Sequence, residues 1–188
     1  MVENPVLVNI TDIRVARDPA TLSCLGLGSC IGLCAFDPLT GIGGMVHLML
    51  PGTGINTPTD QPGKFVDTGI PKLIELMESE GAKRSRLLVA YAGGAQIFKG
   101  SLSTFMEGFS VGTRNQLAVE QCIAQLNLNC IARDVGGHSS RNLVLFTQTA
   151  EVRISSSASG GKVLCVLDPA KNSRKRQEEE IIYNISNG

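Results

Sequence analysis

Two amphipathic helical stripes divide a chain that otherwise consists of short apolar runs bounded by glycine and proline. Over residues 65–80, apolar side chains recur at helical spacing, and Gly81 follows as a stop signal. A second stripe over 117–126 follows Thr113 and Gln116, which together resemble a capping box. Because strands precede, separate and follow these helices without strict alternation, the sequence predicts a mixed α/β (α+β) fold, a layered sandwich of mixed β-sheets with two main helices.

The predicted strands are the apolar runs around these helices. They cover residues 6–15, 22–36, 45–50, 86–91, 128–133, 142–146 and 151–155. Asp37-Pro38 and Gly41 supply turn residues between the second and third runs, which predicts a buried hairpin. The small residues of Gly93-Gly94-Ala95 would let backbone or a ligand approach closely.

The length of 188 residues fits one ordinary domain, which we expect over residues 1–168. Residues 169–188 segregate their basic and acidic side chains, which is typical of a charged, solvated tail. Residues 51–63 are rich in Pro, Gly and Thr, so we expect a surface loop there that could act as a lid.

Charge and hydropathy argue against several classes of function. Seventeen basic and seventeen acidic residues give a formal net charge of zero, which disfavours a nucleic-acid-binding protein. Trp is absent and aromatic residues make up 4% of the chain, which disfavours a stacking platform for single strands. The N-terminus does not resemble a secretory signal, and no apolar stretch approaches the ~20 residues needed to cross a bilayer. We therefore expect a cytoplasmic protein without direct membrane insertion.

Six cysteines occur without a CxxC pair: Cys24, Cys30, Cys34, Cys122, Cys130 and Cys165. Free cysteine most often packs as a small hydrophobe, so most of these are expected to be buried, reduced thiols, and Cys122 to lie in the core. Three of them, with His47, offer zinc-ligand types, but the spacing lacks the short knuckle of structural zinc sites. A Cys24–Cys30 disulfide is a further alternative, although six strand residues span about 20 Å. We expect neither a metal nor a cofactor.

One cysteine and one histidine frame the predicted hairpin, Cys30 before it and His47 within its second strand. A thiol becomes a strong nucleophile when a neighbouring imidazole takes its proton, and residues on adjoining strands can meet that geometry. Gly26 and Gly28 leave room for substrate beside the thiol and let backbone N–H groups point at a developing oxyanion, and we expect Gly28 and Ser29 to bind substrate. On the motif alone, however, a single histidine among apolar residues is more often structural.

The same segment resembles the signature of the chemoreceptor glutamine deamidase family, CheD. That signature is a Leu-Gly-Ser-Cys strand, followed seventeen residues later by His in a Gly-Gly-x-x-His-x-x-Leu-Pro segment, and both halves are present here. The resemblance continues through residues 93–95, 112–115, 134–137 and Arg141, so it covers nearly everything except the termini. It implies a fold similar to that of bacterial toxins that deamidate glutamine.

By this resemblance, Cys30 attacks a receptor glutamine, His47 shuttles protons, and water releases glutamate from a thioester, as in other Cys/His hydrolases. The implied partners are the cytoplasmic helices of chemoreceptors and a CheC-type chemotaxis phosphatase. The family places a threonine six residues before the nucleophile as its third catalytic member, where this chain has Cys24. A thiol is a poorer hydrogen-bond partner than a hydroxyl, although a backbone carbonyl could orient the histidine instead. The alternative is a weakly active or inactive member that acts mainly as a binding partner and regulator of the phosphatase.

Three further polar residues have two interpretations each. His138 follows Gly136-Gly137 in a polar turn, where a solvated loop residue is favoured over a place in the substrate groove. Arg114 and Arg141 are predicted to donate to loop carbonyls, with contact to acidic receptor side chains as the alternative.

Overall fold

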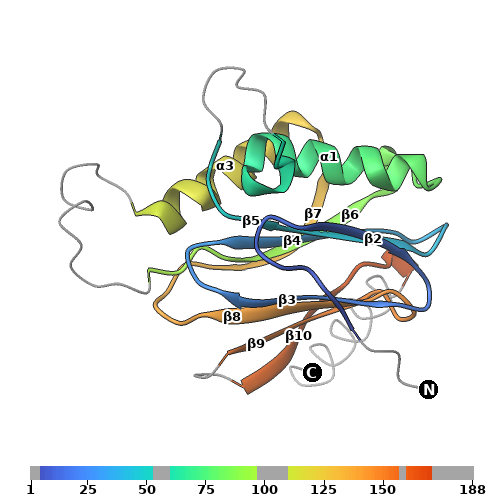
Figure 1. Ribbon diagram of the computed structural model, residues 1–188. Coiled ribbons are helices and arrows are strands. Elements are labelled where there is room, and N and C mark those ends of the chain that lie inside the picture. Colours follow the sequence, from blue (N-terminus) through green and yellow to red (C-terminus); the bar gives the residue numbers. More distant parts are fainter. Residues whose placement is uncertain (1–4, 53–59, 97–109, 157–159, 171–188) are drawn as a thin grey trace, which may run out of the picture.

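The computed structural model describes residues 5–52, 60–96, 110–156 and 160–170. Within these ranges, two five-stranded sheets lie face to face and two α-helices cover the outer face of one of them (Figure 1). The prediction of a layered sandwich of mixed sheets with two main helices is confirmed. Most of the expected lid, residues 53–59, and the tail from residue 171 onward lie outside the described residues. None of the helices described is long and apolar enough to cross a membrane.

The sheet beneath the helices, here called the helix-side sheet, has the strand order β2-β5-β4-β6-β7. Its strands are β2 (Ile13–Arg17), β4 (Ile31–Asp37), β5 (Ile42–Leu48), β6 (Leu88–Gly93) and β7 (Asn129–Val135). The other sheet, here called the outer sheet, has the order β1-β3-β8-β9-β10. Its strands are β1 (Val6–Leu7), β3 (Thr21–Leu27), β8 (Arg141–Phe146), β9 (Glu151–Ser156) and β10 (Gly160–Val166). The β1–β3 and β6–β7 pairs are parallel, and the other pairs of these sheets are antiparallel.

The helices α1 (Val66–Ser79) and α3 (Val111–Gln125) pack on the helix-side sheet (Figure 1), and two short 3-10 turns cover Pro62–Lys64 and Arg84–Arg86. In α1, apolar positions at helical spacing are buried, as predicted, and Gly81 follows the helix with a φ of +105°. The prediction for the start of α3 is wrong. Ser110 is the N-cap, and its side chain accepts a hydrogen bond from the backbone N–H of Thr113.

The predicted buried stripe of α3 is only partly correct. Val119 and Cys122 are buried, which confirms Cys122 as a core residue, whereas Leu117 is 44% exposed. The buried face of α3 is therefore narrower than the spacing of its apolar residues predicted. Asn115, a polar residue, is fully buried on this face.

Two predicted strands each divide between the sheets. The run 6–15 becomes β1 and β2, because a turn at Asn9–Asp12, with Thr11 at a φ of +69°, carries the chain from one sheet to the other. The run 22–36 becomes β3 and β4, because the chain bends at Gly28 and Ser29. The extended span assumed between Cys24 and Cys30 is therefore wrong. Cys24 lies in β3 of the outer sheet and Cys30 lies in the bend before β4, and both are free thiols.

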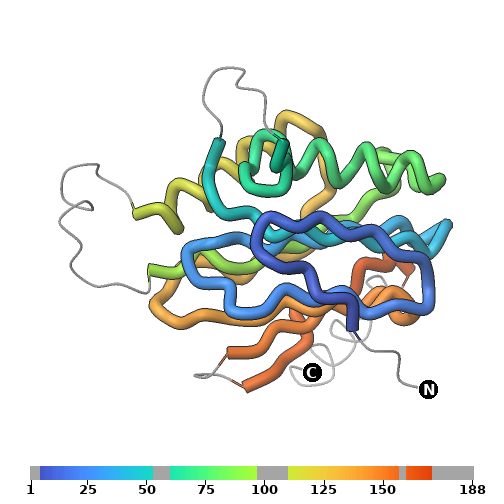
Figure 2. Tube along the Cα trace, viewed as in Figure 1, coloured from blue at the N-terminus to red at the C-terminus, as the bar shows by residue number. Residues whose placement is uncertain are grey.

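The connections from β3 to β4 and from β7 to β8 lie at the same end of the sandwich, as Figure 2 shows. Strand pairing brings further segments there, because Gly93 at the end of β6 pairs with Ile31, and Leu27 pairs with Arg141. Gly93 allows the close approach predicted for it. A Cβ built on this residue would lie 2.1 Å from the carbonyl oxygen of Cys30.

Candidate active site

Cys30 lies in the bend immediately before β4, with its side chain partly exposed and packed against the core between the sheets. Burial raises the pKa of the Cys30 thiol above its usual value of 9.0, and a hydrogen bond from its own backbone N–H opposes part of this rise. The thiol is therefore protonated in the resting protein at neutral pH. A nucleophilic role would require a neighbouring group to take its proton.

His47 lies in β5 directly opposite Gly32 of β4 and is 3% exposed. Burial lowers the pKa of the imidazole below its usual value of 6.5, and the hydrogen bond with Val8 and the charge of Asp12 oppose this shift. The ring is consequently neutral at pH 7. A neutral imidazole is the form that can accept a proton.

The two residues face the space between the sheets, Cys30 from the bend before β4 and His47 from β5. His47 pairs with Gly32, two positions after Cys30, and the regular β4–β5 pairing ends at Ile31 and Leu48, immediately after Cys30. Glycine at position 32 leaves this face of β4 without a side chain opposite the ring. No hydrogen bond joins the Cys30 thiol to the His47 ring among the described residues, so the catalytic roles of both stay a prediction.

A backbone carbonyl holds the His47 ring. Nδ1 lies 3.3 Å from the carbonyl oxygen of Val8, which is buried just beyond β1. The chain that follows also pairs with the backbone of His47: the N–H of Thr11 donates to its carbonyl at 3.0 Å, and its N–H donates to the carbonyl of Asp12 at 3.1 Å. Since a carbonyl can only accept, the neutral ring carries its proton on Nδ1 and leaves Nε2 as the acceptor.

Cys24 faces the same space from the outer sheet and is fully buried. Its Cβ lies 3.3 Å from the point that a Cβ of Gly32 would occupy. Burial, followed by the proximity of Cys30, strongly raises the pKa of the Cys24 thiol, which is therefore neutral. In the described part of the chain, no group of three or more His, Cys, Asp or Glu side chains could hold a metal ion.

The carbonyl groups of the bend are each fixed by a donor from another segment. The N–H of Ala95 donates to Gly28 at 2.7 Å, and the N–H of Gly94 donates to Cys30 at 2.9 Å. The carbonyl of Ser29 accepts from Nδ2 of Asn115 at 2.8 Å. These contacts fix the backbone of the bend that carries the Cys30 thiol.

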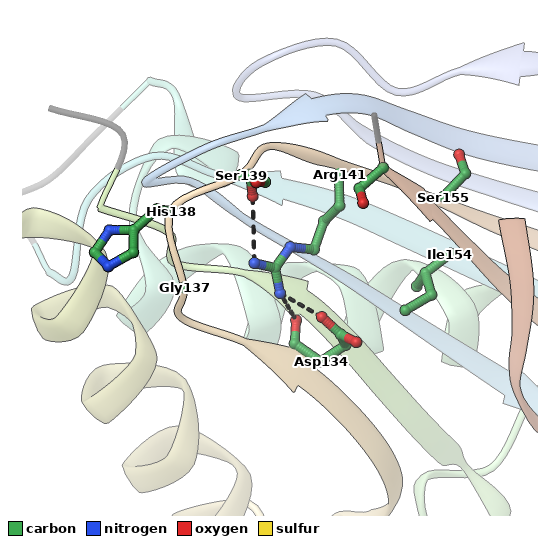
Figure 3. A pocket seen from close by; sticks show the side chains of 8 residues that line it. Asp134, Gly137, His138, Ser139, Arg141, Ile154 and Ser155 are labelled. Carbon is green, nitrogen blue, oxygen red and sulfur yellow. Dashed lines mark hydrogen bonds and ion pairs between the residues drawn. The ribbon is translucent and has the colours of Figure 1, made fainter. Parts of the chain in front are cut away.

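A pocket of about 230 Å³ lies beside this end of the sandwich, lined by residues that include Asp134, His138 and Arg141 (Figure 3). Arg141 donates to the backbone carbonyls of Asp134, Gly136 and Ser139 and also pairs with the Asp134 carboxylate. The prediction that Arg141 serves loop carbonyls is confirmed, while that for Arg114 stays a prediction. His138 is exposed, as expected, with Nδ1 3.1 Å from the Gln96 carbonyl.

Comparison with known proteins identifies the family. The family model for CheD chemotactic sensory transduction matches residues 49–156. A probable chemoreceptor glutamine deamidase CheD of Desulforamulus reducens is 35% identical over 159 residues, which cover 85% of this chain and 95% of the relative. The chain belongs to the CheD family. Proteins of the same description from Caldanaerobacter subterraneus and Clostridium botulinum are 33% and 35% identical over 157 residues, covering 84% of this chain and 96% of each relative.

The part matched by the CheD family model begins two residues after His47, so it contains neither His47 nor Cys30. It does contain the segments that support the bend, namely Gly93 to Ala95, Asn115 and Arg141. The match to the family model therefore draws on the framework around the candidate site.

Sequence reasoning missed two groups of this site. The carbonyl of Val8 could not be assigned from sequence, because a backbone acceptor carries no residue-specific signal. Asn115 did leave a signal, since it precedes Val119 by one helical turn and so occupies the buried stripe of α3. A polar residue on an apolar face requires hydrogen-bond partners.

Proposed function

We propose that this protein hydrolyses glutamine side chains of bacterial chemoreceptors to glutamate, with Cys30 as nucleophile and His47 as proton carrier. The substrate class comes from the CheD relatives, which are described as probable chemoreceptor glutamine deamidases. One observation carries the mechanism: Cys30, at the start of β4, and His47, in the adjoining β5, both face the space between the sheets, with the thiol partly exposed and the ring held by a carbonyl. The reaction requires no cofactor.

The first half of the reaction forms a thioester. Nε2 of His47 takes the thiol proton of Cys30, and the sulfur attacks the carboxamide carbon of the glutamine. The tetrahedral intermediate then collapses: the carbon–nitrogen bond breaks, and the imidazolium returns the proton to the leaving nitrogen, which departs as ammonia. The acyl group of the former glutamine remains attached to the sulfur.

The second half is hydrolysis of that thioester. Nε2 of His47 takes a proton from water, the hydroxide attacks the acyl carbon, and the carbon–sulfur bond breaks. The Cys30 thiolate recovers the proton from the ring, which restores the neutral pair. The net change is glutamine plus water to glutamate plus ammonia, so the pair is regenerated without any external reagent.

We assign stabilisation of the oxyanion to the bend before the nucleophile. The carbonyls of Gly28 and Ser29 are both engaged by donors within the protein, which fixes the peptide planes of this segment. The N–H groups of Ser29 and Cys30, which lie in these two planes, would then donate to the developing oxyanion, and fixed donors of this type typically contribute about 10²–10³ in rate.

Two further assignments follow from the resemblance. The protein would act in the cytoplasm on the cytoplasmic helices of receptors, and it would bind a CheC-type chemotaxis phosphatase. The alternative, a member acting mainly as a regulator of that phosphatase, was suggested by Cys24 in place of the family threonine. The hydrogen bond between His47 and Val8 favours the enzyme, because it supplies an orienting partner that does not depend on residue 24.

The deciding experiment is deamidation of a purified receptor cytoplasmic fragment, followed by peptide mass spectrometry. Wild-type protein should convert specific glutamines to glutamate, Cys30→Ala should abolish conversion, and His47→Ala should slow it by about 10²–10⁴-fold. Cys130→Ala removes an exposed thiol on β7 and is the matched control, with unchanged conversion expected. Undiminished conversion by Cys30→Ala would overturn the mechanism.

A further inference from the structure

We propose that Asn115 is a positioning residue that fixes the strands carrying Cys30 and His47 relative to one another. This proposal rests on the function proposed above. Asn115 is fully buried in α3, and its Nδ2 donates to two backbone carbonyls, that of Ser29 at 2.8 Å and that of Met49 at 2.9 Å. Ser29 immediately precedes Cys30, and Met49 follows His47 by two residues, so one amide group joins both segments.

The bridge lies where regular pairing of the two strands stops. The last pair of the β4–β5 ladder is Ile31 with Leu48, so Cys30 and Met49 are no longer paired. Beyond that point the chain leaves β4, since the N–H groups of Met49 and Leu50 both donate to the carbonyl of Lys64. Asn115 therefore supplies the connection that the ladder lacks at the position of the thiol.

Close backbone packing brings α3 within reach of both strands. A Cβ on Gly112 would lie 2.5 Å from the carbonyl oxygen of Gly94, so the first turn of α3 rests directly on the segment after β6. That segment in turn holds the bend, through the hydrogen bond from the Gly94 N–H to Cys30. The helix, the bend and Asn115 therefore form one connected support behind the nucleophile.

The geometry requires a primary amide. Both acceptors of Asn115 are carbonyl oxygens, so the group between them must present two N–H donors. Its Oδ1 is buried and has no hydrogen-bond partner among the described residues, which shows that the side chain is oriented by its two donors. An aspartate carboxylate of nearly the same shape would place an anionic oxygen against two carbonyls and lose both bonds.

The expected effects on kcat, on KM and on Cys30 alkylation distinguish a positioning role from a general contribution to stability. Asn115 touches neither substrate nor reacting atoms, so Asn115→Asp should lower kcat by about ten- to a hundredfold while KM changes little. The pH dependence of Cys30 alkylation by iodoacetamide, followed on the Cys30 peptide, should shift toward that of His47→Ala, because the thiol and the ring are no longer held together. This second readout does not require any deamidase activity.

Val119→Ala is the matched control, because Val119 lies one turn further along α3, is fully buried and contacts neither strand end through a hydrogen bond. It should lower the melting temperature yet leave kcat and the alkylation profile as in the wild type. A loss of kcat in both variants in proportion to their loss of melting temperature would overturn the proposal, as would a wild-type alkylation profile in Asn115→Asp. Conversion that is independent of Cys30 would refute the proposed mechanism instead, and the alkylation profiles would still decide the role of Asn115.

A measurement on the wild type covers the case in which Asn115→Asp does not fold. The side-chain amide hydrogens of Asn115, observed by nuclear magnetic resonance, should exchange with solvent far more slowly than those of Asn127, an exposed residue just beyond the same helix. Comparable exchange rates for the side-chain amides of Asn115 and Asn127 would contradict the proposal that Asn115 bridges the two strands.

Discussion

The carbonyl oxygen of Val8 lies 3.3 Å from Nδ1 of His47, so the N-terminal segment orients the ring from the space between the two sheets. Val8 is itself fixed, because its N–H donates to the carbonyl of Ser23 in the outer sheet at 2.9 Å. A partner on Nδ1 determines which ring nitrogen is left to accept a proton. In this protein the partner is part of the backbone and is independent of the side chain at position 24.

Replacement of Cys24 should therefore have a small effect on catalysis. Loss of a side chain that orients a catalytic histidine would typically cost about 10- to 100-fold in activity. We expect Cys24→Ala to lower kcat by less than about tenfold and Cys24→Thr to raise it little, because Val8 already holds Nδ1. Receptor deamidation rates measure the effect, with Cys34→Ala as the control for removing a fully buried thiol from the same core. A far larger loss in Cys24→Ala than in Cys34→Ala would identify Cys24 as the third catalytic member.

The pH dependence of kcat/KM should show a broad plateau. The reaction starts from a neutral thiol and a neutral imidazole, and burial shifts both groups in the direction that preserves these forms. The pKa of His47 is lowered from 6.5, so protonation of the free enzyme should reduce kcat/KM only below that pH. The pKa of Cys30 is raised from 9.0, so the alkaline decline should begin above that pH. Rates measured from about pH 5 to about pH 10 test both limbs, and an acid limb above 6.5 would contradict the neutral starting pair.

Local patterns were sufficient for the β4–β5 hairpin and for α1, because turn residues and helical periodicity mark them directly. They failed where the chain changes sheet. All seven residues of β4 are buried, so the run 22–36 shows no alternation from which a change of sheet could be read. The bend is decided instead by hydrogen bonds from Gly94 and Ala95, which are distant in sequence.

The candidate site was predictable to a different degree for each of its parts. Cys30 and His47 were found from their residue types, their spacing and the resemblance of the signature. Their supports were not found, because Val8 acts through its backbone and Asn115 acts through contacts with two strands that only the folded chain brings together. Side-chain chemistry is therefore visible in the sequence, whereas the groups that position it are fixed by tertiary packing.

Gly93 approaches Cys30 so closely that no side chain fits between them. A Cβ on Gly93 would lie 2.1 Å from the carbonyl oxygen of Cys30, and the φ of Gly93 is +126°. Gly93→Ala should displace the nucleophile and lower kcat by about a hundredfold, since a shift of about 1 Å can cost that much. Gly160→Ala, at a φ of +64° and with no atom within 4 Å of the added Cβ, imposes backbone strain in β10 alone and should keep the wild-type kcat. Deamidation rates and melting temperatures, measured side by side, separate the two effects. A destabilised Gly93→Ala with undiminished kcat would show that this approach supports the fold without positioning the thiol.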